Sequence, residues 1–77
     1  MISGAQIREA RELLGWSQVT LSNKAKIRPA TLVRAESVDG VPDLTRGRAL
    51  KIERVLKAAG VEFTEGEQPG VRLRPVL

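Results

Sequence analysis

Four cationic side chains lie close together in this 77-residue chain, and phosphate binding is the chemistry that they could support. Residues 13–35 contain no acid, although the whole chain has nine acidic and 13 basic residues and a net charge of +4. Concentrated positive charge suits a polyanion, because phosphates neutralised by a protein release condensed counterions. A solvated charged face would have the same composition, so charge alone does not decide. The four cations are Lys24, Lys26, Arg28 and Arg34.

The residue types that most enzymes need are missing. The chain has no cysteine and no histidine, which removes thiolate nucleophiles, imidazole bases and the usual nitrogen or sulfur ligands of zinc. Glutamates occur in the turn-rich segment 62–67, but without histidine, cysteine or tyrosine to assist them. We therefore expect no catalysis, no metal and no cofactor.

The segment before the cations has the pattern of a capped helix. Ser3 and Gln6 have the spacing of a capping box, and Gly15 suits a left-handed C-terminal cap. Apolar residues recur between them at helical intervals, which predicts a helix with one face in the core. These apolar residues are Ile7, Ala10 and Leu14.

The basic stretch itself predicts two short helices separated by a turn. Ser17 can cap the first of them, which should end near Ala25. Pro29 favours an extended residue before it and suits the first position of a helix, so the next helix should begin there. Two short helices with basic charge on the second have the proportions of a helix-turn-helix, although ordinary helical hairpins share this layout.

The rest of the chain predicts a fourth helix and a β-hairpin. Residues 37–43 have loop composition, after which Asp43 or Thr45 can cap a helix that ends at Gly60. Apolar and polar residues then alternate on both sides of a turn-rich segment at 65–70, which is the period of paired strands. The apolar face of this hairpin consists of Val61, Phe63, Val71 and Leu73.

These elements predict a mainly α fold in one domain, with helices over residues 1–60 and a hairpin and tail over residues 61–77. A chain of this size buries only about 60% of its unfolded surface, so its stability should be marginal unless subunits pair. No segment has the pattern of a signal peptide or a membrane helix. We therefore expect a soluble cytoplasmic protein without a membrane partner.

Three pieces of sequence around the predicted turn share one register. They are GWSQVTL from Gly15 to Leu21, IRPATL from Ile27 to Leu32, and Glu36. With them the chain resembles the Cro/C1-type (XRE-like) helix-turn-helix family over roughly residues 7–56. The resemblance implies a lambda-repressor-like four-helix DNA-binding domain. In such a domain the second helix lies over the phosphate backbone and the third enters the major groove of double-stranded DNA.

The resemblance also implies roles for individual side chains. Gln18 would hold a phosphate or brace a neighbouring side chain, and Arg34 has the planar fork that bonds guanine O6 and N7. Val33 and Ala30 can offer only apolar contact, most usefully to thymine methyl groups, and the alternative for both is plain helix surface. The groove-facing positions are Arg28, Pro29, Ala30, Val33 and Arg34. The candidate phosphate contacts are Ser17, Gln18, Lys24, Lys26, Thr31 and Ser37.

One structural pair and two departures complete the comparison with the family. Arg11 and Glu36 match positions that pair, and such a pair would lock the first helix to the end of the third. Lys26 occupies the turn position where the family usually has glycine, and a left-handed non-glycine residue costs about 1–2 kcal/mol unless the turn adapts. The groove-facing set lacks the Gln and Asn that read adenine, so base readout would rest on Arg34 and on DNA shape.

The family generally binds inverted repeats as twofold dimers, which requires a dimer surface. A lone two-stranded hairpin is marginal in water, and its apolar face needs cover. We expect the hairpin to pack on the fourth helix and to pair across a homodimer through an edge strand, with Val61, Phe63, Val71 and Leu73 in the interface. The alternative is a hairpin that folds only onto its own subunit.

The sequence therefore favours a transcriptional regulator, most simply a repressor or autoregulator, that binds DNA as a homodimer without a small-molecule ligand. Two alternatives remain open. The chain could be an antitoxin or another partner-binding module with a DNA-binding domain, in which the hairpin is the partner surface. It could also be a recombination accessory protein that bends DNA.

Overall fold

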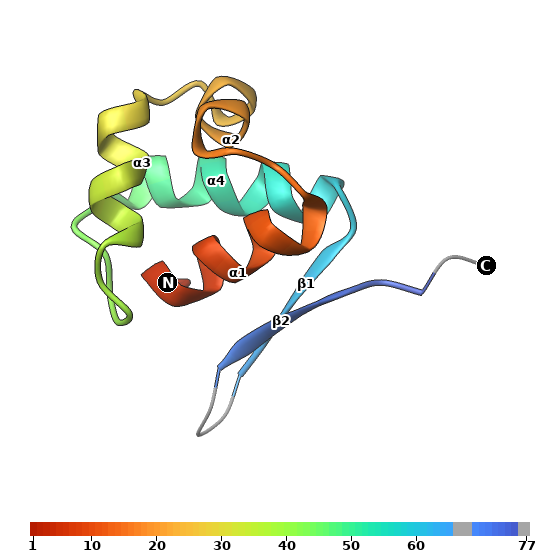
Figure 1. Ribbon diagram of the computed structural model, residues 1–77. Coiled ribbons are helices and arrows are strands. Elements are labelled where there is room, and N and C mark those ends of the chain that lie inside the picture. The colour runs from red at the N-terminus through yellow and green to blue at the C-terminus, as the bar shows by residue number, and fades with distance from the viewer. Residues whose placement is uncertain (66–68, 76–77) are drawn as a thin grey trace.

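The computed structural model describes residues 1–65 and 69–75, and within them four helices precede a two-stranded antiparallel hairpin (Figure 1). The mainly α class with a C-terminal hairpin is thus confirmed. The expected hairpin turn falls partly on residues 66–68, and the expected tail over residues 75–77 falls partly on residues 76–77; both of these stretches lie outside the described residues. The elements are α1 (Gly4–Leu14), α2 (Gln18–Ala25), α3 (Pro29–Glu36), α4 (Arg46–Ala58), β1 (Val61–Thr64) and β2 (Gly70–Leu73).

Side-chain caps begin the helices where the sequence predicts. Ser3 and Gln6 form a complete capping box, in which the amide of Gln6 donates to Ser3 Oγ at 3.0 Å and the amide of Ser3 donates to Gln6 Oε1 at 2.9 Å. Gly15 ends α1 in the left-handed conformation with a φ of 69°. Of the two candidate caps for α4, Thr45 takes the role, and its Oγ1 accepts from the amide of Arg48 at 3.2 Å.

The core lies between the four helices and β1. Each of these elements contributes an apolar side chain whose exposed fraction is close to zero. Removing such side chains from water is the main stabilising term for a domain of this size. The core residues from α1 to β1 are Ile7, Leu21, Leu32, Ile52, Leu56 and Val61.

The hairpin is attached to the helices of its own chain. Val61 pairs with Leu73 and Phe63 with Val71 across the two strands. β1 packs on α4 as predicted, but β2 packs along α1, a contact that the sequence did not reveal. The buried side-chain amide of Gln6 reinforces this second contact, because its Nε2 donates to the carbonyls of Thr64 and Gly70 at 3.1 Å each.

The first turn of α1 lies directly against the segment that follows α3. The amide of Gly4 donates to the carbonyl of Gly40 at 2.8 Å. A Cβ atom at position 4 would collide with the backbone carbonyl oxygens of Ala35 and Val38. Glycine is therefore required here by the close approach of two backbones.

Arg8 on α1 also binds the end of α3 and the segment that follows it. Its Nη1 donates to the carbonyl of Glu36 and its Nη2 to Asp39 Oδ1, both at 2.8 Å. The hydrogen bond to the Asp39 carboxylate raises the pKa of the Arg8 guanidinium above its ordinary value. The C-terminal end of α3 is thus held by α1.

Two glycine substitutions test the close approach. We expect Gly4→Ala to lower the free energy of unfolding by about 1–3 kcal/mol, because a methyl group is forced between packed backbones. Gly47→Ala is the control, since it stands inside α4 and a methyl group added there would have no heavy atom within 4 Å. The control should raise stability by about 0.5–1 kcal/mol. Equal effects of the two variants in urea denaturation would contradict the close approach at Gly4.

Candidate nucleic-acid interface

The outer face of α3 carries all the residues that the sequence places toward a groove. Positions one turn apart lie on the same face of a helix, and the opposite face of α3 is buried in the core through Leu32 and Ala35. In Figure 1, α3 lies at the outer edge of the helices, beside α2. The structure therefore gathers one exposed surface from Arg28, Pro29, Ala30, Val33 and Arg34.

The turn before α3 sets the direction of this helix. Lys26 adopts the left-handed conformation with φ 56° and ψ 48°, so the turn keeps the geometry of a glycine turn despite the lysine. The amide of Ile27 closes the turn by donating to the carbonyl of Ser22 at 3.0 Å. Pro29 then starts the helix, and the side chain of Arg28 makes no capping hydrogen bond. The guanidinium of Arg28 is exposed at the N-terminal end of the α3 surface.

A buried carboxylate fixes the other end of α3. The Glu36 side chain is only 3% exposed, and Arg11 donates to it from Nε at 3.1 and 3.2 Å and from Nη2 at 2.9 Å. Arg11 also donates from Nη1 to the carbonyl of Trp16 at 3.0 Å, just before α2. Gln18 Nε2 lies 3.5 Å from Glu36 Oε1. One network thus joins the end of α1, the start of α2 and the end of α3.

Gln18 lies within reach of Glu36, as the bracing role requires, and its other predicted role, phosphate binding, stays a prediction. It stands at the first position of α2, where backbone amides lack partners within the helix and favour an anion. Because Gln18 also contacts Glu36, the start of α2 lies at the Arg34 end of the α3 surface. An anion bound at these amides would therefore lie next to the end of the exposed α3 face.

Two hydroxyl groups among the phosphate candidates are already used inside the chain. Ser17 Oγ accepts from the amide of Thr20 at 3.0 Å and donates to Thr20 Oγ1 at 2.9 Å, so it serves as the cap of α2. Ser37 Oγ donates to the carbonyl of Arg34 at 2.6 Å. Both hydroxyls support helix ends, whereas the hydroxyl-bearing Thr31 is half-buried on the flank of α3.

The two lysine candidates differ in their surroundings. Lys24 Nζ lies 5.1 Å from the centroid of the Trp16 ring, which is within the range of a cation–π contact. Lys26 is exposed in the turn next to Arg28. The structure thus brings Lys26 to the N-terminal end of the α3 surface and orients Lys24 toward the only tryptophan.

α4 carries a second group of cations that the sequence reasoning did not assign to a site. Helix α4 contains five basic residues and one acidic residue, Glu53, which pairs with Lys57 at 2.8 Å. The signal was available in the sequence, because basic residues recur every three positions from Arg48 to Lys57. The basic residues of α4 are Arg46, Arg48, Lys51, Arg54 and Lys57, all of them exposed.

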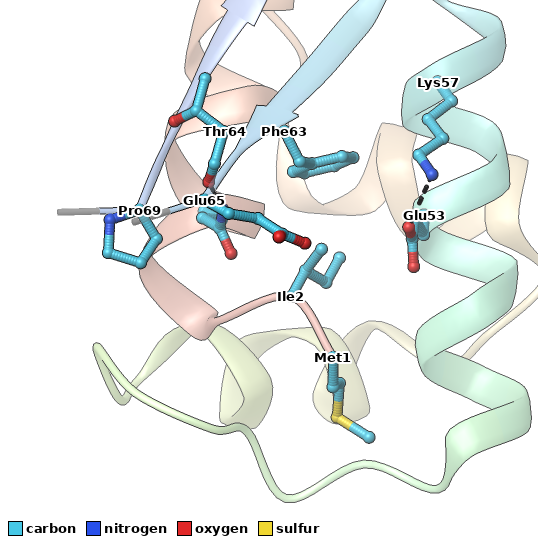
Figure 2. A pocket seen from close by; sticks show the side chains of 9 residues that line it. Met1, Ile2, Glu53, Lys57, Phe63, Thr64, Glu65 and Pro69 are labelled. Atoms are coloured by element: carbon cyan, nitrogen blue, oxygen red, sulfur yellow. Dashed lines mark hydrogen bonds and ion pairs between the residues drawn. The ribbon is translucent and has the colours of Figure 1, made fainter. Parts of the chain in front are cut away.

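A hollow of about 410 Å³ lies between the N-terminal segment, α4 and the hairpin (Figure 2). Ile2 and Phe63 supply apolar groups, and the Glu53–Lys57 ion pair lies on one wall. The amide of Gln6, which also lines the hollow, is already bonded to hairpin carbonyls. The Gln6 amide and the Glu53–Lys57 pair are therefore already engaged within the chain.

Comparisons with known proteins leave the interface to be judged on its geometry. No family model matches the chain, and no curated protein or solved structure matches it either. Within residues 1–65 and 69–75, no helix is long and apolar enough to cross a membrane. The same residues contain no cluster of three or more Asp, Glu, His or Cys side chains that could hold a metal ion.

Removing one partner of the buried pair tests whether the Glu36 network holds the helices together. We expect Arg11→Met to lower the free energy of unfolding by about 3–5 kcal/mol, because Glu36 would remain buried without its counterion. Adding Glu36→Gln should recover part of the loss, since a neutral amide needs no counterion. Lys57→Met, which breaks an exposed ion pair, should cost less than about 1 kcal/mol. Similar midpoints for Arg11→Met and Lys57→Met in urea would show that the Glu36 network is not structural.

Proposed function

We propose that the chain is a sequence-specific DNA-binding transcriptional regulator that inserts α3 into the major groove. The observation that carries the proposal is the exposed face of α3, which has an arginine near each end and small or apolar side chains between them. A major groove admits an α-helix, and each base pair presents a distinct set of donors and acceptors there. The absence of acidic residues over 13–35 favours approach to phosphates.

The side chains on this face have separate tasks in the proposal. Arg34 reads guanine through two hydrogen bonds, and Val33 and Ala30 contact thymine methyl groups. Arg28 and Lys26 contact phosphates at the start of α3. Gln18 and the free amides of α2 hold a phosphate at the other end, where they lie next to Glu36.

Rigid placement of α2 relative to α3 supports sequence reading. Phosphate contacts fix the register of a protein on the duplex, and base contacts then report the sequence at that register. The hydrogen bonds that join Arg11, Glu36 and Gln18 hold the two helices in one arrangement before DNA arrives. Binding therefore requires little ordering of the interface, which favours affinity.

In the full proposal the helices have a lambda-repressor-like arrangement, and a homodimer binds an inverted-repeat operator and represses a promoter. Half-sites in such operators lie about one helical turn apart, roughly 34–36 Å, so that two α3 helices enter successive major grooves on one face. We thus propose that the protein is a regulator of the Cro/C1-type (XRE-like) class. The sequence resemblance and the exposed α3 face support this class.

The function can be tested by selecting the genomic DNA fragments that the purified protein binds. The affinity of the parent and of variants for the best selected site is then measured. We expect an enriched inverted repeat. Arg34→Ala should lose about 1–3 kcal/mol of discrimination between the preferred base and its substitutes, because the bidentate contact is gone. Gln18→Ala should weaken binding to all sequences alike, since phosphates carry no sequence information.

Arg54→Ala is the matched control, because Arg54 is an exposed arginine on α4 and lies outside the α3 surface and the hairpin. It should bind the selected site with the parent's base preference. Failure to enrich any sequence, or equal behaviour of Arg34→Ala and Arg54→Ala, would count against DNA reading by α3. The chain would then be better explained as a partner-binding module.

A further inference from the structure

The outer edge of β2 has no partner strand among the described residues, because the sheet consists of β1 and β2 alone. The amide of Arg74 donates to the carbonyl of Gly60 at 2.7 Å, which marks these two residues as a hydrogen-bonded pair. Hydrogen-bonded and non-hydrogen-bonded pairs alternate in an antiparallel ladder. Val71 and Leu73 therefore direct their backbone N–H and C=O groups outward, where a further strand can add.

The geometry of the edge allows few ways of pairing with an identical strand. Residues whose backbone groups point outward must face each other, so within β2 a twofold axis can pass only through Gly70, Val71, Arg72 or Leu73. An axis at Gly70 would pair Val71 with Pro69 of the partner subunit, which has no N–H, and would therefore use less of the described edge than an axis at Val71. An axis at Arg72 would place two copies of this arginine directly opposite each other. An axis at Leu73 would place Arg72 opposite Arg74 of the partner subunit. Like charges in such positions are destabilising.

An axis at Val71 avoids both charge conflicts. It places Arg72 opposite Gly70 of the partner subunit, while Arg72 keeps its own ion pair with Glu62 at 3.6 Å. Backbone hydrogen bonds then link the two copies of Val71, and the amide of Leu73 donates to the carbonyl of Pro69 of the partner subunit. Pro69 has no N–H, but its carbonyl can accept.

We propose that β2 pairs antiparallel with β2 of a second copy about a twofold axis at Val71, which joins the two hairpins into one four-stranded sheet. The proposal rests on the proposed function, because a reader of inverted repeats needs a second copy. It deepens that function by naming the surface and the register.

The surroundings of the edge fit an identical strand. Val71 and Leu73 lie on the same face of the hairpin as buried Val61, and Leu73 is still 46% exposed. On α1, Leu13 is also 46% exposed, and it lines an open hollow of about 330 Å³ together with Val71. A second β2 would lie beside this hollow and bring its own apolar face to Leu13. Both subunits contribute the same groups, as an isologous interface requires.

Single-cysteine cross-linking tests the register, because the natural chain has no cysteine. Val71→Cys places a thiol on the axis, where the two Cα atoms of a hydrogen-bonded pair are about 5.5 Å apart and within disulfide range. Mild oxidation of the purified full-length variant, without DNA, should give mostly covalent dimer. Val33→Cys, which is 48% exposed on α3, is the control and should cross-link at least about tenfold more slowly. Equal rates for the two variants would overturn the proposal.

A pair of charge variants gives a second readout in case the thiol disturbs the hairpin. A Cβ atom at Gly70 would meet only Thr64 Oγ1, at 3.3 Å, and Gly70→Glu and Gly70→Arg share this contact. Opposite Arg72 of the partner subunit, the glutamate should lower the dimer dissociation constant and the arginine should raise it, each by about three- to tenfold. Sedimentation equilibrium without DNA measures both constants. A monomer at all concentrations, or equal constants for the two variants, would refute the pairing.

Failure of this proposal is distinguishable from failure of the proposed function. A cross-linked dimer that enriches no DNA sequence would support the pairing and refute the DNA reader. An enriched inverted repeat without cross-linking at position 71 would support the reader and show that another surface forms the dimer.

Discussion

The carboxylate of Glu36 is the group on which the arrangement of the first three helices depends. It is buried at the end of α3 and receives hydrogen bonds from Arg11 on α1 and Gln18 on α2. An ion taken out of water is costly unless its hydrogen bonds are satisfied, so each donor is constrained in position. Moving any one of these helices would expose the Glu36 carboxylate or separate it from a hydrogen-bond donor. Electrostatics therefore fixes a geometry that apolar packing alone would leave looser.

The hairpin depends on a different polar group, the amide of Gln6. This side chain closes the capping box of α1 with its oxygen and holds two hairpin carbonyls with its nitrogen. Burial of a primary amide costs free energy unless its N–H groups and its oxygen form hydrogen bonds. Here the partners of the Gln6 side chain are the backbone amide of Ser3 and two backbone carbonyls of the hairpin. α1 thus connects two units, the DNA-facing helices proposed above and the hairpin, through residues on two of its faces.

Local signals in the sequence predicted most element boundaries, because caps and turns depend on near neighbours. Ser3, Ser17 and Pro29 each mark a helix start at the position seen in the structure. Long-range choices were not readable in this way. From the sequence, Gln6 was recognised only as a capping residue. Its hydrogen bond to Gly70, which supports the packing of β2 on α1, joins residues that lie 64 positions apart. The contact of Lys24 with Trp16 likewise depends on where the folded chain places the ring. The cations of α4, in contrast, were visible in the sequence and were not assigned to a site.

The bonds from Gln6 to Thr64 and Gly70 span separations of 58 and 64 residues, while each helix forms from contacts among near neighbours. Closing such a large loop is slow compared with forming a helix, and it requires almost the whole chain. During synthesis the helices can therefore form before the hairpin has left the ribosome, and α1 then exposes the surface that β2 later covers. Folding of this small domain is completed only when its C-terminal strands dock against the helix that was made first.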